Sequence, residues 1–250
     1  MQKNNPILIN VPHASTFIPE EELSYFVTPF VARELAVMTD HYCDDLYATG
    51  DTMLRFPISR LVCDAERFRD DASEIMAEVG MGAIYTRCSD GSPLKVVTEE
   101  QKEELLRCYY NPYHARFEFL VAEKLREFDC CLIIDGHSFY PTPLPYERNQ
   151  NLDRPDICLG TDPFHTPSEL AEAAYEYFTS CGYSVAFNEP FAGSIVPLKY
   201  YGKDKRVISI MIELNRRLYM DTECRKSEGY ERVKRDVEGV IELLRSNGIN

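Results

Sequence analysis

The sequence has 250 residues, of which 44% are hydrophobic and 27% charged, and its formal net charge is −14. That length and composition fit one globular domain with a sizeable core. The negative charge disfavours a nucleic-acid binder, which needs a basic surface, and no apolar stretch reaches the roughly 20 residues that a membrane-spanning helix needs.

The cysteines and the N-terminal segment predict a cytoplasmic protein. Nine cysteines are present and none forms a Cys-x-x-Cys pair, which is typical of reduced, mostly buried thiols. The opening segment MQKNNPILINVPH has one lysine and only a short apolar run, so it does not resemble a secretory signal. We therefore expect a chain that binds neither nucleic acid nor membrane.

The first half of the chain predicts strands separated by helices. In chain order we expect a buried strand over 7–13, a helix over 30–50, strands over 52–56 and 59–64, and a helix over 98–128. The last helix should begin at a capping box formed by Thr98 and Gln101. Residues 66–95 are polar and irregular, and so long a loop in a compact domain either serves a function or conceals an element.

The second half repeats this alternation. We expect a strand over 130–136, a proline-rich loop over 139–155, a strand over 156–160, a helix over 166–181 opened by a second capping box at Thr166, strands over 183–188 and 206–215, and a helix over 227–246. Several strands are continuous apolar runs, which is typical of parallel sheets buried on both faces. The sequence predicts a single α/β domain over 1–250, with a mixed, mostly parallel central sheet and helices on both faces.

Two of only five histidines close predicted buried strands, at His13 and His137. Ligands of open α/β sheets bind beyond the carboxyl ends of the strands. Either histidine alone is more simply a polar residue that ends a strand, but two imidazoles and a carboxylate form the usual catalytic zinc site. Asp40, His41 and Asp44 are alternatives for the third ligand, and we assign Asp44, although a solvated acidic helix start has the same pattern.

Glu213 lies near the end of the most apolar predicted strand. A buried glutamate is rare unless it is paired or used in chemistry. Burial would raise its pKa, which suits a general base that later returns the proton. The alternative is a salt bridge from Glu213 to Arg216 or Arg217.

Four further residues are candidates for binding substrate. Arg60 and Arg67 flank another predicted strand end, and a planar guanidinium matches a carboxylate with two hydrogen bonds. A salt bridge to Asp64 is the structural alternative for both. Ser138 would line the pocket, and Gly193 lies where a backbone must pass closely in the loop after the 183–188 strand.

Six segments resemble the motifs of the N-formylglutamate amidohydrolase family. In the same order and at similar spacing, the chain contains NVPHAS, TDHYCDDLY, SRLVCDAER, DGHS, NEPFAGSIVP and IELNRRLYMD. The resemblance implies a fold like that of the zinc carboxypeptidases and aspartoacylases. It also implies a zinc-dependent amidase that releases formate from N-formyl-L-glutamate, a small anionic N-acyl amino acid, during histidine degradation. By this resemblance His13 and His137 bind Zn²⁺, Asp44 suits the third ligand, and Glu213 is the catalytic glutamate.

One segment departs from the family pattern. The wider superfamily holds a substrate carboxylate with Asp-x-Asn-Arg, whereas this chain has Asp64-Ala65-Glu66-Arg67. The added negative charge of Glu66 should weaken the binding of a dicarboxylate, and the glycine that usually follows the His-Ser pair is absent from PHAST. The alternatives are therefore a peptidase, a deacylase of another small amide, or a non-catalytic binding member of the fold.

Overall fold

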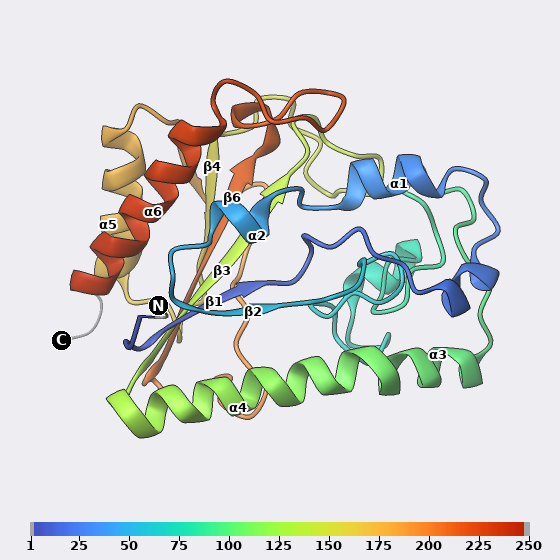
Figure 1. Ribbon diagram of the computed structural model, residues 1–250, viewed down its shortest axis with the longest axis horizontal. Helices are drawn as coiled ribbons and strands as arrows, with labels where there is room; N and C mark the ends of the chain where they lie inside the picture. The colour runs from blue at the N-terminus through green and yellow to red at the C-terminus, as the bar shows by residue number, and fades with distance from the viewer. Residues whose placement is uncertain (1–2, 248–250) are drawn as a thin grey trace.

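The computed structural model describes residues 3–247, and in them a single sheet of six strands has the order β2-β1-β3-β6-β4-β5 (Figure 1). The strands are β1 (Ile7–Val11), β2 (Thr52–Arg55), β3 (Cys131–Phe139), β4 (Ile157–Gly160), β5 (Val185–Phe187) and β6 (Val207–Asn215). The α-helices are α1 (Val31–Met38), α2 (Cys43–Leu46), α3 (Glu99–Leu105), α4 (Asn111–Phe128), α5 (Ser168–Ser180) and α6 (Tyr230–Asn247). Short 3₁₀ turns are η1 (Glu20–Tyr25), η2 (Ile75–Val79) and η4 (Arg216–Leu218), and η3 (Leu106–Tyr110) is a π-helical turn.

The sheet is mixed and mostly parallel, as the sequence predicts. Strands β2, β1, β3 and β6 run parallel, β4 runs antiparallel to β6, and β5 is parallel to β4. Helix α4 lies across one face, while α5 and α6 cover the other (Figure 1). No helix among residues 3–247 is both long and apolar enough to span a membrane.

The helix predicted over 30–50 is divided in two. Thr39 is extended, with φ −78° and ψ 138°, and Tyr42 is left-handed, with φ 66°. The amide of Asp40 donates to the carbonyl of His13 at 3.0 Å. The prediction of one continuous helix is therefore wrong, because the chain turns at Asp40 to contact the end of β1.

Two other local predictions are also wrong. Residues 59–64 form turns instead of a strand, and the amide of Asp64 donates to the carbonyl of Ala83 in the long loop. The predicted capping box at Thr166 does not form, because its hydroxyl donates to the carbonyl of Ser209. The box at Thr98 is confirmed by reciprocal hydrogen bonds with Gln101. Tertiary contacts thus override local signals where a polar side chain has a better partner.

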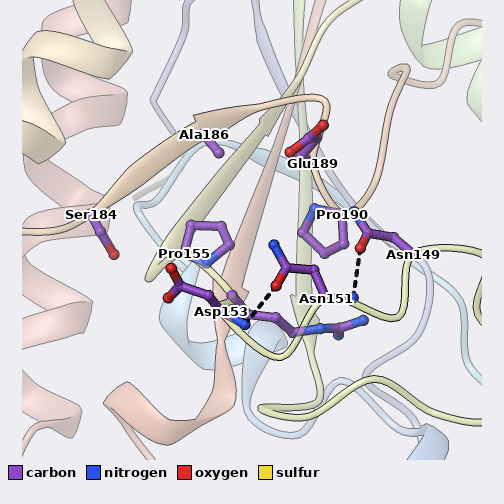
Figure 2. A pocket seen from close by; sticks show the side chains of 9 residues that line it. Asn149, Asn151, Asp153, Pro155, Ser184, Ala186, Glu189 and Pro190 are labelled. Atoms are coloured by element: carbon purple, nitrogen blue, oxygen red, sulfur yellow. Dashed lines mark hydrogen bonds between the residues drawn. The ribbon is translucent and has the colours of Figure 1, made fainter.

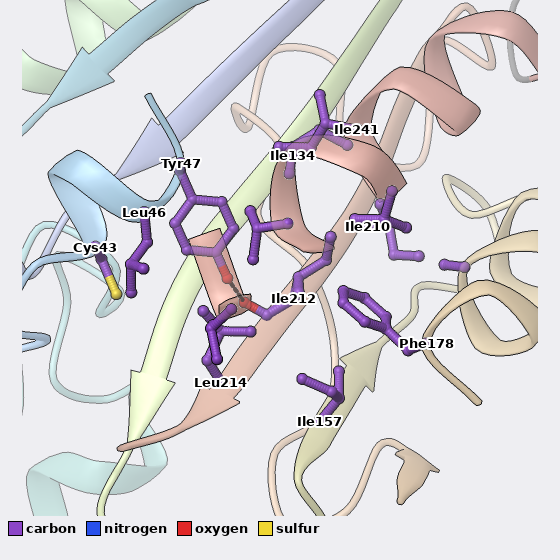
Figure 3. Packing of buried hydrophobic residues seen from close by; sticks show 14 of the residues in the cluster. Cys43, Leu46, Tyr47, Ile134, Ile157, Phe178, Ile210, Ile212, Leu214 and Ile241 are labelled. Atoms are coloured by element: carbon purple, nitrogen blue, oxygen red, sulfur yellow. Dashed lines mark hydrogen bonds between the residues drawn. The ribbon is translucent and has the colours of Figure 1, made fainter. Parts of the chain in front are cut away.

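The two faces of the sheet differ in polarity near the carboxyl ends of its strands. On the face under α5 and α6, apolar side chains continue along the strands, including Ile134 and Ile212 (Figure 3). On the α4 face, Ile133 is apolar, but Asp135 and His137 follow it along β3. Because alternate residues of a strand share a face, this polar end of the α4 face holds the candidate site.

Candidate functional site

Three neighbouring segments bring the predicted residues together. His13 follows β1, His137 lies in β3, and Glu213 lies opposite His137 in the register of β3 and β6. Registered residues of adjacent parallel strands point to the same side. The three side chains are buried, and the two imidazole centroids are 5.1 Å apart. The prediction that strand ends gather these residues at one edge of the sheet agrees with this geometry.

Glu66 completes a group that can hold a metal ion. Its Oε2 lies 2.9 Å from His137 Nε2 and 3.9 Å from His13 Nδ1, and one ligand atom from each of the three residues lies within 4.8 Å of the others. Burial and the charge of Asp135 raise the pKa of Glu66 to about 8. From the sequence alone, Glu66 is only a departure from a carboxylate-binding motif. The one available signal was its place two residues after Asp64.

Asp40 is the member of the TDHYCDD segment that reaches the histidines. Its Oδ2 lies 3.1 Å from His137 Nδ1 and 3.8 Å from His13 Nδ1, and its Oδ1 accepts from Arg216 Nη2 at 2.8 Å. Burial alone would raise the pKa of Asp40, but the hydrogen bond with His137 and the charge of Arg216 hold it well below its usual range. Asp40 is thus a charged neighbour of the group formed by Glu66 and the two histidines.

Asp44 is not brought to the histidines, which corrects its assignment as the third ligand. Its side chain is 45% exposed and lies 3.6 Å from Arg55. His41 is turned away as well, with Nε2 bonded to the carbonyl of Ala36. The reason is the left-handed residue Tyr42, which prevents Asp40 and Asp44 from sharing one helical face.

Asp64 determines which nitrogen of His13 is free. Asp64 Oδ1 lies 2.8 Å from His13 Nε2, and its Oδ2 accepts from Tyr85 and Arg60. Burial lowers the pKa of His13 to about 4, so the ring is neutral and donates its single proton to Asp64. Among the described residues, no group hydrogen-bonds His13 Nδ1, which leaves that lone pair directed at the site.

Glu213 has the environment expected of a proton carrier. Burial raises its pKa to about 7, and its Oε2 has no hydrogen-bond partner within residues 3–247. The alternative of a salt bridge is not observed in the described chain, because Arg216 bonds Asp40 and Ser138 while Arg217 bonds Asp156. Glu213 is thus buried with a free carboxylate oxygen.

The two predicted arginines differ in how far they are already engaged. Arg60 Nη2 donates to Asp64 at 2.8 Å, and Arg60 Nε donates to Tyr85. Arg67 Nε lies 3.8 Å from Asp64 and, in the part of the chain described, makes no hydrogen bond. Both side chains adjoin the carboxylate that orients His13, and Arg67 retains the greater capacity to bind another anion.

Ser138 and Gly193 have supporting positions. Ser138 Oγ accepts from Arg216 Nε at 3.1 Å, and its amide contacts Asp40 Oδ2 at 3.3 Å, so Ser138 holds the Asp40–Arg216 pair. Gly193 has φ 91°, a conformation that favours glycine. Its loop crosses the site edge, where the amide of Ile195 donates to Asp135 Oδ2 at 3.2 Å.

A separate hollow of about 210 Å³ lies around the start of β4 and β5 (Figure 2). Its wall is partly polar and partly apolar and is formed by Asn149, Asn151, Asp153, Arg154, Pro155, Ser184, Ala186, Glu189 and Pro190. Ala186 is registered with Cys158, and Cys158 with Glu213. The hollow therefore lies along the same row of the sheet as Glu213 but contains neither histidine.

Comparisons with known proteins agree with this architecture. The family model of N-formylglutamate amidohydrolase matches residues 5–220. The N-formylglutamate amidohydrolase from Ralstonia eutropha JMP134 is 22% identical with a TM-score of 0.85, over 98% of this chain and 95% of that chain. A gene product of Agrobacterium tumefaciens is 18% identical with a TM-score of 0.71, over 97% of this chain and 90% of that chain. No curated protein matches the chain. At these identities the solved structures establish the fold.

Proposed function

The chain belongs to the N-formylglutamate amidohydrolase family of hydrolases, and on that premise we propose that it is a zinc-dependent amidohydrolase. Its proposed substrate is a small anionic N-acyl amino acid such as N-formyl-L-glutamate, and its proposed pathway is histidine degradation in the cytoplasm. The observation that carries this proposal is the group of His13, Glu66 and His137 beside a buried Glu213. The free thiols of all nine cysteines agree with a reducing compartment.

The residues present fit Zn²⁺. His13 Nδ1 is a buried nitrogen with no hydrogen bond from residues 3–247, and it lies 3.9 Å from Glu66 Oε2. Two imidazoles and one carboxylate are a donor set that zinc accepts, with a position left for substrate or water. We propose that His13, Glu66 and His137 hold the ion. When bound, zinc would polarise the amide carbonyl and make water more acidic.

Glu213 is the proposed general base. A carboxyl group with a pKa of about 7 can take a proton from the attacking water and return it to the nitrogen of the leaving amine. Its free Oε2 supports this role, since no described group competes for the proton. Burial of Glu213 also excludes bulk water from the oxygen that carries the proton.

Arg67 is the proposed partner of the substrate carboxylate. Arg60 already bonds Asp64 and Tyr85, so we assign it to orienting Asp64 and, through it, His13. Arg67 retains a buried Nε without a hydrogen bond in the described chain. If Glu66 binds the cation, its charge is offset and repels a dicarboxylate less than the sequence alone suggests.

The test is formate release from N-formyl-L-glutamate by zinc-loaded protein, with N-acetyl-L-glutamate, other N-formyl amino acids and a dipeptide in parallel. We expect the formyl glutamate to be turned over preferentially. The matched control is Glu213→Gln, which should retain stoichiometric zinc while kcat falls by about 10²–10⁴-fold. Preferential cleavage of the dipeptide would replace the proposal with a peptidase. A protein that never holds zinc would indicate a non-catalytic member.

A further inference from the structure

Tyr47 contacts the candidate site from the opposite face of the sheet. The residue directly follows α2, and its side chain is fully buried in the apolar core beside Ile134 and Ile212 (Figure 3). Its hydroxyl donates to the carbonyl of Ile212 at 2.6 Å and also contacts the carbonyl of His137 at 3.2 Å. One phenol therefore bridges β3 and β6 at the level of the site.

Gly136 provides the space that this contact needs. A Cβ atom added to Gly136 would lie 2.9 Å from ring atoms of Tyr47, which is closer than real Cβ contacts allow. A glycine inside a strand weakens it and marks a place where another group approaches the backbone closely. The ring of Tyr47 is that group, and it lies directly against the peptide before His137.

We propose that Tyr47 is a positioning residue that sets the placement of His137 relative to Glu213. The carbonyl of Ile212 belongs to the peptide bond that leads into Glu213, and the carbonyl of His137 belongs to the peptide bond that leaves His137. Both site side chains emerge from the other face at these two points. The shared hydroxyl holds these two peptide planes in a fixed relation. Groups outside the ligand set commonly orient the ligands of a metal site in this way.

The same chain segment also contacts the imidazole of His137. Asp40 Oδ2 lies 3.1 Å from His137 Nδ1, while Tyr47, seven residues later, contacts the carbonyl of the same histidine. The left-handed turn at Tyr42 separates these two contacts. Residues 40–47 thus hold His137 at its ring and at its backbone, which explains why the helix predicted there is interrupted.

The experiment compares Tyr47→Phe with Tyr183→Phe. Each removes a tyrosine hydroxyl that donates a hydrogen bond, but the hydroxyl of Tyr183 donates to Asp236 of α6 at 2.7 Å, and Tyr183 lies outside residues 40–47. We measure the Zn²⁺ dissociation constant by chelator competition and the absorption spectrum of the Co²⁺-substituted protein. Both are followed at a temperature where all variants are folded. Tyr47→Phe should raise the dissociation constant about 10-fold and change the cobalt spectrum, with kcat lowered more than KM is raised. Tyr183→Phe should leave all of these unchanged.

A second variant keeps the inference testable if Tyr47→Phe does not fold. Gly136→Ala retains the hydroxyl but displaces the ring, and it should produce the same loss of zinc affinity. Unchanged zinc affinity and cobalt spectrum in a folded Tyr47→Phe protein would overturn the inference, and so would failure of both variants to fold, since the contact would then serve the fold. The inference rests on the proposed function, but different results contradict each. Wild-type protein that binds no zinc contradicts the proposed function, whereas zinc-binding wild-type protein with an unaffected Tyr47→Phe variant contradicts only the inference.

Discussion

Removing Arg216 should leave the buried carboxylate of Asp40 without the only arginine that the described chain pairs with it. Arg216 and Asp40 have side chains 4% and 2% exposed, with Nη2 and Oδ1 2.8 Å apart. Arg216 also donates to Ser138 Oγ at 3.1 Å and to the carbonyl of Val37. Breaking such a pair by removing one partner typically costs about 3–5 kcal/mol. We expect Arg216→Met to lower the free energy of unfolding by about 3 kcal/mol, the lower end of that range, because the hydrogen bond between His137 and Asp40 remains.

The assay is urea unfolding of metal-free protein in the presence of a chelator, performed as a double-mutant cycle. Asp40→Asn should also destabilise the protein, and the double variant should be more stable than the sum of the single changes predicts, with a coupling of about 2–3 kcal/mol. The control is Arg225→Met, which removes an exposed pair with Asp221 of nearly the same length, 2.9 Å, and should change stability little. If the changes in the free energy of unfolding caused by the two single substitutions simply add in the double variant, the reasoning is refuted, because Arg216 would then not stabilise the charge of Asp40.

Three further predictions test other parts of the structure. Asp44→Ala should retain zinc stoichiometry and activity, because Asp44 is half exposed and paired with Arg55; loss of zinc by equilibrium dialysis would restore it as a ligand. Burial lowers the pKa of Lys95 from 10.5 to about 7, so between these pH values the unfolded chain binds a proton that the folded chain lacks. The free energy of unfolding should therefore rise with pH between about 7 and 10.5, by up to about 1.4 kcal/mol per pH unit relative to Lys95→Met. Chemical unfolding of both proteins across this pH range measures it, and parallel pH curves for the two would contradict the prediction. Thr98→Ala should lower the free energy of unfolding by about 1 kcal/mol through loss of the capping box at α3, and an unchanged urea midpoint would count against that.

Apolar runs and the residues that end them were enough to determine the strands that carry the site. The run before His137 and the run containing Glu213 form β3 and β6, the two longest strands. Such runs can be recognised in the sequence because a strand that is buried on both faces of a parallel sheet is apolar along its whole length. The sequence accordingly predicts His13, His137 and Glu213 as candidate site residues, and the structure brings all three to one edge of the sheet.

Only the tertiary structure decided which carboxylates join the histidines. Glu66 reaches His137 from a loop that has no periodic pattern, and that loop is held through Asp64, whose amide bonds Ala83 and whose carboxylate bonds His13. Asp40 comes to the site because the helix predicted around it breaks at a residue with a left-handed backbone. Sequence spacing describes neighbours within one element, whereas these carboxylates are positioned by contacts between segments far apart in the chain, and such contacts leave no local pattern to read.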